Sequence, residues 1–244
     1  MKPFRLIVSI LLLLLSASVS AVEYIESYHS DIEVQPNGDL LVTETIRVHA
    51  EGKAIRRGIY RDFPTRYKDL EGKNHTVGFE LLSVKRDNHS EPFRTKSLSN
   101  GTRVYIGDRN VYLTSGFYDY QISYRSSRQL GFFDDFDELY WNVTGSDWAF
   151  DIRQASARVS LPGTAGNLSL TGYTVPQGAT EQNLNFRRLD ANRAYFVTTR
   201  SLAAREGLTI VMGWPKGLIQ EPDAAQQRAW FLADNKASII IVAG

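Results

Sequence analysis

The sequence alternates between apolar and polar residues over long stretches, and this alternation constrains the fold more than any other feature. Residues 40–50, 116–125 and 152–161 all follow it. A period of two residues places every second side chain on the same face of a β-strand, so one face can be buried while the other meets water. Helical periodicity is nearly absent before Pro222. The sequence therefore predicts an all-β fold, in the form of an antiparallel β-sandwich.

Turn signals and face patterns predict individual strands. Asn37-Gly38 lies between two strand-like runs, residues 24–34 and 40–50, and Asn-Gly at such a position is a strong hairpin signal. In the second run we expect the more apolar face to turn toward the core, with Leu40, Val42, Glu44, Ile46 and Val48. In residues 116–125 the aromatic face, with Tyr118, Tyr120, Ile122 and Tyr124, is expected in the core beside Trp141. Further strands are predicted over 77–86, 103–106, 110–113, 138–143, 168–175, 194–199 and 207–214, and a polar loop over 87–100.

The first 21 residues have the pattern of a secretory signal peptide. Lys2 and Arg5 precede an apolar run from Leu6 to Leu15, and small residues follow as far as Ala21. An uncleaved anchor is the alternative, but a transmembrane helix needs about 20 apolar residues and this run is shorter. We therefore expect an exported protein, cleaved after Ala21, whose β domain spans residues 22–218.

The last residues, 237–244, are all apolar or small and follow a polar stretch over 219–236. A run this short cannot cross a bilayer. We expect it to be the start of a truncated transmembrane helix, with 219–236 as a polar linker; a buried C-terminal strand is the alternative. The first interpretation makes the protein membrane-anchored, with this domain on the periplasmic or cell-surface side.

Composition excludes several classes of function. The sequence has no cysteine, which rules out disulfides, thiol catalysis and Cys-based zinc sites. Without the first 21 residues there are 26 basic residues against 27 acidic ones, so no basic surface for nucleic acid is indicated.

One segment, residues 132–148, is unusually dense in acidic and aromatic residues. Its four carboxylates are candidate ligands for Ca²⁺, although their spacing is not that of an EF-hand: Asp134, Asp135, Asp137 and Glu138. Two carboxylates on one surface, such as Asp135 and Asp137, could instead serve a hydrolase that acts on an envelope glycan. The third interpretation is a solvated acidic loop paired with nearby arginines.

Two further groups are candidate binding residues. Arg57, Arg61 and Asp62 could hold an anionic ligand; the alternative, which we favour, is an Arg61–carboxylate pair that fixes a loop against the sheet. Trp141 and Trp148 could stack on a sugar, but large aromatic residues beside a turn are more often part of the core.

Four motifs together resemble a known family. NGDLLVTETI at 37–46, GIYRDFP at 58–64, DELYWNVTGSDW at 137–148 and VSLPG at 159–163 are similar to the YciQ-like family of predicted bacterial membrane proteins, defined by a domain of unknown function, DUF2207. The resemblance implies a signal peptide, an extracytoplasmic β domain, then transmembrane helices and a further domain. The family supplies no catalytic residues to carry over.

No catalytic motif is present, so we do not expect an enzyme. The predicted function is an extracytoplasmic binding or structural module, held at the membrane through its missing C-terminal part, with an envelope protein as a candidate partner. The alternatives are a carboxylate-dependent glycan hydrolase and a Ca²⁺-stabilised, adhesion-type domain. Apart from Ca²⁺, no cofactor is expected.

Overall fold

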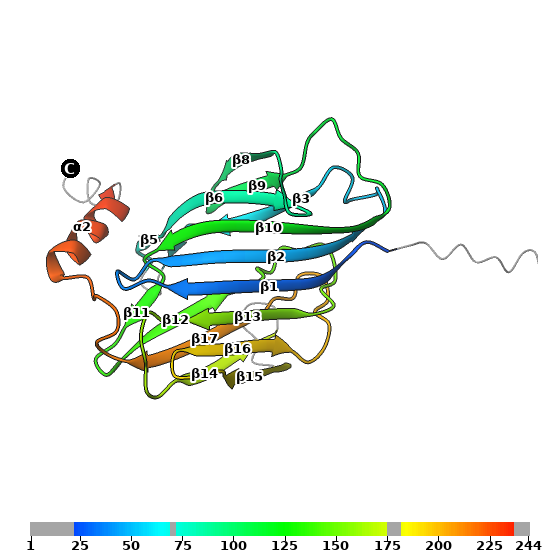
Figure 1. Ribbon diagram of the computed structural model, residues 1–244. Coiled ribbons are helices and arrows are strands. Elements are labelled where there is room, and N and C mark those ends of the chain that lie inside the picture. The colour runs from blue at the N-terminus through cyan, green and yellow to red at the C-terminus, as the bar shows by residue number, and fades with distance from the viewer. Residues whose placement is uncertain (1–21, 69–71, 175–181, 237–244) are drawn as a thin grey trace, which may run out of the picture.

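The computed structural model describes residues 22–68, 72–174 and 182–236. Strands make up most of this chain, and a single short α-helix follows them (Figure 1). The prediction of an all-β fold is confirmed. The expected signal peptide and the apolar segment 237–244 lie outside the described residues.

The largest sheet has eight strands in the order β15-β16-β13-β1-β2-β10-β6-β7. Its central strands are long because the sequence alternates without interruption there. The strands of this sheet are β1 (Tyr24–Val34), β2 (Leu40–Ala50), β6 (Gly78–Arg86), β7 (His89–Ser90), β10 (Gly116–Ser127), β13 (Ala155–Ser160), β15 (Leu184–Arg188) and β16 (Arg193–Thr198). The predicted hairpin at Asn37-Gly38 is confirmed, since β1 and β2 pair in register from Val34–Leu40 onward.

One pairing in this sheet is parallel. Strand β1 pairs with β13 in the same direction, from Tyr28–Ala155 to Glu33–Ser160, whereas the other strand pairs are antiparallel. Parallel strands need a long crossover connection. Here the connection is the whole chain from β2 to β12: β2 pairs with one edge of β1, and β13, which follows β12, pairs with the other edge.

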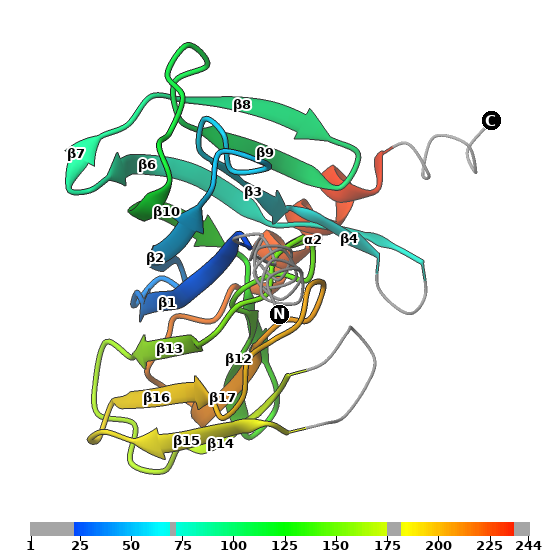
Figure 2. The same cartoon turned by 90° about the vertical axis from the view of Figure 1, so that its right-hand side faces the viewer.

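Two smaller sheets cover the large one. The four-stranded sheet, in the order β11-β12-β17-β14, consists of β11 (Leu130–Phe132), β12 (Phe136–Asn142), β17 (Thr209–Pro215) and β14 (Ser169–Tyr173). The three-stranded sheet, in the order β3-β9-β8, consists of β3 (Ile59–Pro64), β9 (Gly101–Ile106) and β8 (Phe93–Leu98). Figure 2 shows the three-stranded sheet near β6 and β10, and the four-stranded sheet near β13 and β16. A two-stranded ribbon, β4 (Arg66–Lys68) with β5 (Asn74–Thr76), extends beyond β3.

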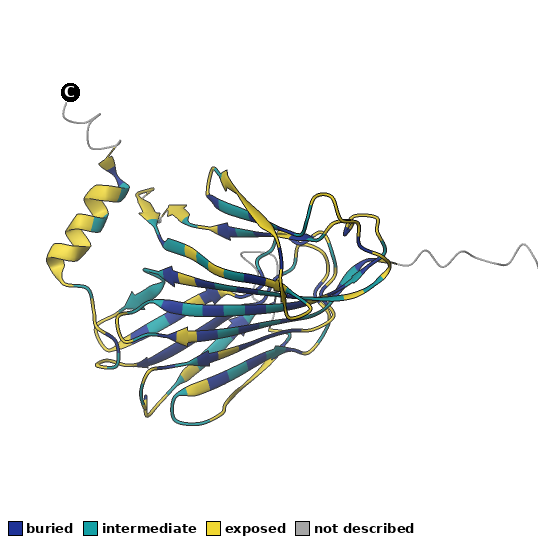
Figure 3. Cartoon of the chain, turned by 45° about the horizontal axis from the view of Figure 1, so that its top comes forward, coloured by how far each residue is buried: buried dark blue, intermediate teal, exposed yellow. Residues whose placement is uncertain are grey.

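The core lies between these layers, and buried and exposed positions alternate along the central strands (Figure 3). All five residues predicted on the inner face of β2 are buried, including the charged Glu44. On β10, Tyr120, Ile122 and Tyr124 are buried as expected, whereas Tyr118 is only half-buried and packs against the core from its edge. The ring of Phe63 from β3 packs on that of Tyr124 at 4.8 Å, which joins the three-stranded sheet to the large one.

Two local predictions are wrong. Residues 87–100 are not one polar loop but contain β7 and β8. Strand β8 is an edge strand whose side chains are almost all exposed, so its sequence lacks the apolar face that would reveal it. Residues 110–113 form no strand; the carboxylate of Asp108 accepts the Asn110 backbone N–H at 2.7 Å and holds a turn there instead.

The stretch expected to be a polar linker, 219–236, contains helix α2 (Ala224–Asp234). Asp223 caps its N-terminus by accepting the Gln226 backbone N–H at 2.7 Å. No residue within the helix is buried, and Phe231 and Leu232 are exposed. Within the described ranges, no helix combines the length and apolar character needed to cross a membrane.

Candidate functional site

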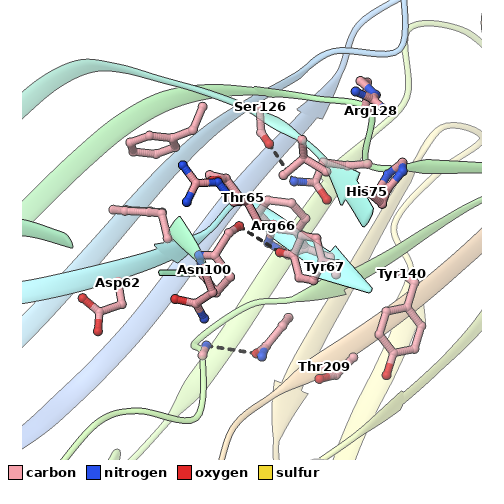
Figure 4. Close-up of a pocket in the computed structure, with 18 of the residues that line it drawn as sticks. Asp62, Thr65, Arg66, Tyr67, His75, Asn100, Ser126, Arg128, Tyr140 and Thr209 are labelled. Atoms are coloured by element: carbon pink, nitrogen blue, oxygen red, sulfur yellow. Dashed lines mark hydrogen bonds between the residues drawn. The ribbon is translucent and has the colours of Figure 1, made fainter. Parts of the chain in front are cut away.

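A cleft of about 980 Å³ opens between the three-stranded and four-stranded sheets. Figure 4 shows Thr65, Tyr67 and Asn100 on one side of it, and Tyr140 from β12 and Thr209 from β17 on the other. Strands β6 and β10 of the large sheet also contribute lining residues. Residues far apart in sequence therefore meet here only because three sheets meet here.

A buried ion pair lies beside the cleft. The Arg61 guanidinium donates to both carboxylate oxygens of Glu44, with Nε–Oε2 at 3.0 Å and Nη2–Oε1 at 3.1 Å. Its Nη1 and Nη2 also donate to the backbone oxygens of Asp62 and Val143, at 2.9 and 3.3 Å. This is the carboxylate pair that the structural alternative predicts, and it ties β3 to β2 and to the chain that follows β12.

Two tyrosines complete this buried cluster. Tyr124 donates its hydroxyl to Glu44 at 2.9 Å, and Arg61 Nε donates to the Tyr28 hydroxyl at 3.1 Å. Burial raises the pKa of both tyrosines well above the ordinary value. Burial alone would lower the pKa of Arg61, but Glu44 raises it, and the net pKa lies well above normal. Arg61 therefore stays charged, and the tyrosines stay protonated.

The local sequence makes room for this guanidinium. A Cβ on Gly145 would lie 2.7 Å from Arg61 Nη1, and Gly145 has φ of +71°, a conformation that glycine adopts without strain. A buried charge is costly unless it is paired and hydrogen-bonded. The sequence places Glu44 at a core-facing position, and a buried carboxylate needs a cationic partner. This is the sequence signal that could have indicated a structural role for Arg61.

The second charged pair at the cleft is Asp62 with Arg103. The guanidinium holds the carboxylate with two contacts, Nε–Oδ1 at 2.6 Å and Nη2–Oδ2 at 2.7 Å. Arg103 also stacks over the Tyr60 ring, 4.1 Å from its centroid. Asp62 therefore has its charge matched within the domain.

The third pair lies at the rim and involves the C-terminal helix. Arg128 Nη2 donates to Asp234 Oδ2 at 2.6 Å, and the guanidinium lies over the Trp230 ring at 4.7 Å. Asn235 then accepts the Asn74 backbone N–H at 2.9 Å and donates to the Asn74 carbonyl at 3.1 Å. Helix α2 is therefore attached through its C-terminal end to the β4–β5 ribbon.

Several polar side chains of the cleft make no hydrogen bond within the described chain. They are five hydroxyls, one amide, one imidazole and one carboxylate: Thr65, His75, Asn100, Tyr140, Ser146, Asp147, Tyr173 and Thr209. The indole N–H of Trp141 is buried without a partner at the same cleft. Unpaired donors and acceptors that converge on a concave surface are the usual mark of a binding site.

The predicted binding residues separate into three groups. Arg61, Asp62 and Trp141 line the cleft, and Trp141 is only 8% exposed. Arg57 lies elsewhere, stacked on Tyr112 at 4.3 Å and hydrogen-bonded to its hydroxyl. Trp148 belongs to the core and donates its indole N–H to the Thr144 carbonyl at 2.8 Å.

The four candidate metal ligands do not converge. Asp137 is 1% exposed and accepts a hydrogen bond from Lys216 Nζ at 2.8 Å, while Glu138 lies on the opposite face of β12. Asp134 and Asp135 are exposed in the turn before that strand. In the described part of the chain no group of three or more His, Cys, Asp or Glu could hold a metal ion. The calcium and hydrolase hypotheses stay predictions that this geometry does not favour.

The solved structures that match this chain are distant. Leukotriene A4 hydrolase from Saccharomyces cerevisiae is 10% identical with a TM-score of 0.46, covering 79% of this chain and 29% of that one. The M1 zinc metallopeptidase from Deinococcus radiodurans is 12% identical with a TM-score of 0.45, covering 78% and 42%. Likeness at this level says nothing about the activity of this chain.

Sequence comparison is more informative. The chain is 30% identical over 231 residues to a protein of Escherichia coli (strain K12) described as uncharacterized protein YciQ, which covers 89% of this chain. The chain spans 36% of that relative's length. Residues 24–214, which contain all four motifs, match the family described as predicted membrane protein (DUF2207) N-terminal domain. The chain therefore belongs to the DUF2207 family of predicted membrane proteins.

Proposed function

We propose that this domain is a recognition module outside the cytoplasm, which binds a component of the cell envelope in its cleft while other parts of the protein hold it at a membrane. The observation that carries the proposal is the set of cleft side chains left without hydrogen-bond partners. Polar groups that face each other across a cleft and have no partner within the protein are available to a ligand.

The placement of these groups also supports recognition. Tyr140 and Thr209 project from neighbouring strands, β12 and β17, and not from loops. Side chains on strands keep a defined spacing, which favours selective binding. By contrast, Arg61 and Asp62 are bound to Glu44 and Arg103, so the cleft lacks a free acid–base pair formed by these residues.

Hydrogen–deuterium exchange on the purified chain tests the proposal. Soluble envelope extract would be separated into a protein fraction and a glycan fraction, and each would be added to the chain. We expect one fraction to slow exchange at amides of residues 61–63, 65–67, 140–142 and 145–147, which line the cleft. If neither fraction protects these amides, the recognition role is wrong and a purely structural role is favoured.

A pair of matched variants ties the effect to the cleft. Thr209→Trp would fill the cleft from β17, whereas Thr45→Trp places the same side chain at a similarly half-exposed position on β2 that does not line it. Protection should disappear in Thr209→Trp and persist in Thr45→Trp. Equal loss in both variants would contradict binding at the cleft.

A further inference from the structure

The charges around the cleft balance one another. Arg61, Asp62 and Arg128 line it, and each is bound to an oppositely charged partner. Among the described lining residues, two charges have no opposite partner, and they differ in sign: Arg66, which donates to backbone carbonyls, and Asp147. A cleft for an anionic or cationic ligand would present an excess of the opposite charge. The described lining of this cleft presents no such excess, so an uncharged ligand fits it best.

The unpaired groups match a ligand that both donates and accepts hydrogen bonds. Thr65, Ser146 and Thr209 offer hydroxyls, which can act either way, and Asn100 offers an amide with both functions. Asn142 accepts the Gly145 backbone N–H through Oδ1, which leaves its NH₂ group available. A chain of sugar units carries hydroxyl groups along its length, each of which is also a donor and an acceptor.

Aromatic rings are exposed on both sides of the cleft. Tyr140 on β12 is 59% exposed, and Tyr67 on β4 is 43% exposed. The negative face of an aromatic ring attracts groups with partial positive charge, such as the C–H faces of a pyranose ring. Burial raises the pKa of Tyr67, so its ring remains a neutral phenol at physiological pH.

The edge of β3 is poorly suited to bind an extended peptide by strand addition. Among the described strands β3 pairs with β9 alone, and its other edge borders the cleft, but the Asp62 carbonyl already accepts Arg61 Nη1. Pro64 on the same strand has no N–H to donate. Strand addition depends on a continuous row of free backbone donors and acceptors, and this edge is interrupted at two of its six residues.

From these observations we propose that the cleft binds a neutral, hydroxyl-rich glycan chain, with Tyr140 as a stacking platform and Thr65, Asn100 and Thr209 as hydrogen-bonding residues. The inference rests on the proposed recognition function and specifies its ligand class. It requires no catalytic step, because binding needs only the groups already described.

Calorimetric titration of the purified chain tests the ligand class. The probes would be three neutral hexasaccharides (cellohexaose, maltohexaose and chitohexaose), one anionic hexamer of galacturonic acid, and a pool of uncharged polar peptides. We expect at least one neutral hexasaccharide to bind, with an affinity that is nearly independent of salt, since no net charge is matched. The anionic hexamer and the peptides should bind at least roughly tenfold more weakly.

Two tyrosine variants provide the matched comparison. Tyr140→Ala should weaken binding by roughly tenfold, since it removes the stacking surface, and Tyr140→Phe, which keeps the ring, should retain most of it. Tyr112→Ala is the control, because Tyr112 is 57% exposed but does not line the cleft; its affinity should equal that of the parent chain.

The outcomes separate the two proposals. Binding of the peptides or of the anionic hexamer at the cleft, without binding of any neutral hexasaccharide, overturns the glycan inference and leaves the recognition function in place. Equal effects of Tyr140→Ala and Tyr112→Ala also overturn it. If no probe binds and envelope extract fails to protect the cleft amides, both proposals fail together.

Discussion

Of the three arginine–carboxylate pairs described at the cleft, two differ clearly in what they hold together. Arg61–Glu44 is a central pair, with side chains 8% and 0% exposed, and joins three parts of the core. Arg128–Asp234 is a rim pair, 15% and 7% exposed, and joins helix α2 to the domain. The N···O contacts are short in both, at 3.0 and 2.6 Å.

The difference shows that contact geometry alone does not set the importance of an ion pair. The central pair is embedded in buried strands, so the whole core has to open before its charges reach water. The rim pair holds a helix with no buried residues, which can detach while the sheets remain folded. Breaking the central pair should therefore destabilise the whole domain, whereas breaking the rim pair should release only helix α2.

The largest effect is expected for Arg61→Ala. The change leaves the Glu44 carboxylate buried without its cation, which typically costs about 3–5 kcal/mol in the free energy of unfolding. Urea denaturation would measure this cost. Arg66→Ala is the control, because Arg66 is exposed and donates only to backbone carbonyls, and it should cost less than about 1 kcal/mol.

A double variant sharpens this test. Arg61→Met with Glu44→Leu removes both charges and should recover much of the lost stability, as replacement of buried ion pairs by apolar residues often does. Recovery should be incomplete, because the hydroxyls of Tyr28 and Tyr124 lose their partners. Equal costs for Arg61→Ala and Arg66→Ala would show that the central pair does not stabilise the core.

A smaller, local effect is expected at the rim. Asn235→Ala removes the hydrogen bonds to the Asn74 backbone, and Asp234→Ala removes those to Arg128 and to the Thr76 N–H. Hydrogen exchange should speed up at the amides of Asn74 and Thr76, while the free energy of global unfolding changes by less than about 1 kcal/mol. Arg228→Ala, on the same helix and without a described contact, should change neither quantity. Global destabilisation as large as that of Arg61→Ala would remove the distinction between the two pairs.

Acid should loosen the rim pair. Burial raises the pKa of Asp234, but the hydrogen bonds from Arg128 and Thr76 outweigh it and hold the pKa below its ordinary value of 3.8. A lowered folded-state pKa contributes stability above the ordinary value, and this stability is lost as pH falls through the folded pKa. Protection of the Thr76 amide, corrected for intrinsic exchange, should thus be constant from neutral pH to about pH 4.5 and decrease below 3.8.

The matching control is Asp234→Asn, which should show little protection of Thr76 and no such decrease. Arg61 keeps its charge throughout this range, because its pKa is raised well above normal. Loss of Thr76 protection already near pH 6 would indicate a different titrating group.

The smallest effect on stability is expected from the addition of Ca²⁺. Because the candidate ligands point in different directions, we expect Ca²⁺ to leave the melting temperature unchanged in the presence and absence of chelator. A rise that chelator reverses, and that is lost in Asp135→Asn/Asp137→Asn, would instead establish a metal site in the acidic segment.

The sequence predicted the fold better than the site. The alternation of β2 and β10 identified most of their buried positions, and the motif at 58–64 contains two of the charged cleft residues, Arg61 and Asp62. Strand β8 was not predicted, because an exposed edge strand has no apolar face to mark it in the sequence. The partners of Arg61 and Asp62, and the unpaired hydroxyls of Thr65 and Thr209, follow from packing that no local pattern encodes.

The sequence by itself determined the all-β class, the first hairpin, the core-facing position of Glu44 and, through four motifs, the family resemblance. These features depend on residues close together in the chain. Only the tertiary structure decided the parallel pairing of β1 with β13 and the cleft between the sheets. It also decided the charged pairs, whose members are 17, 41 and 106 residues apart. The reason is physical: alternation records which side of a strand is buried, whereas the choice of partner depends on how the strands pack once they have formed.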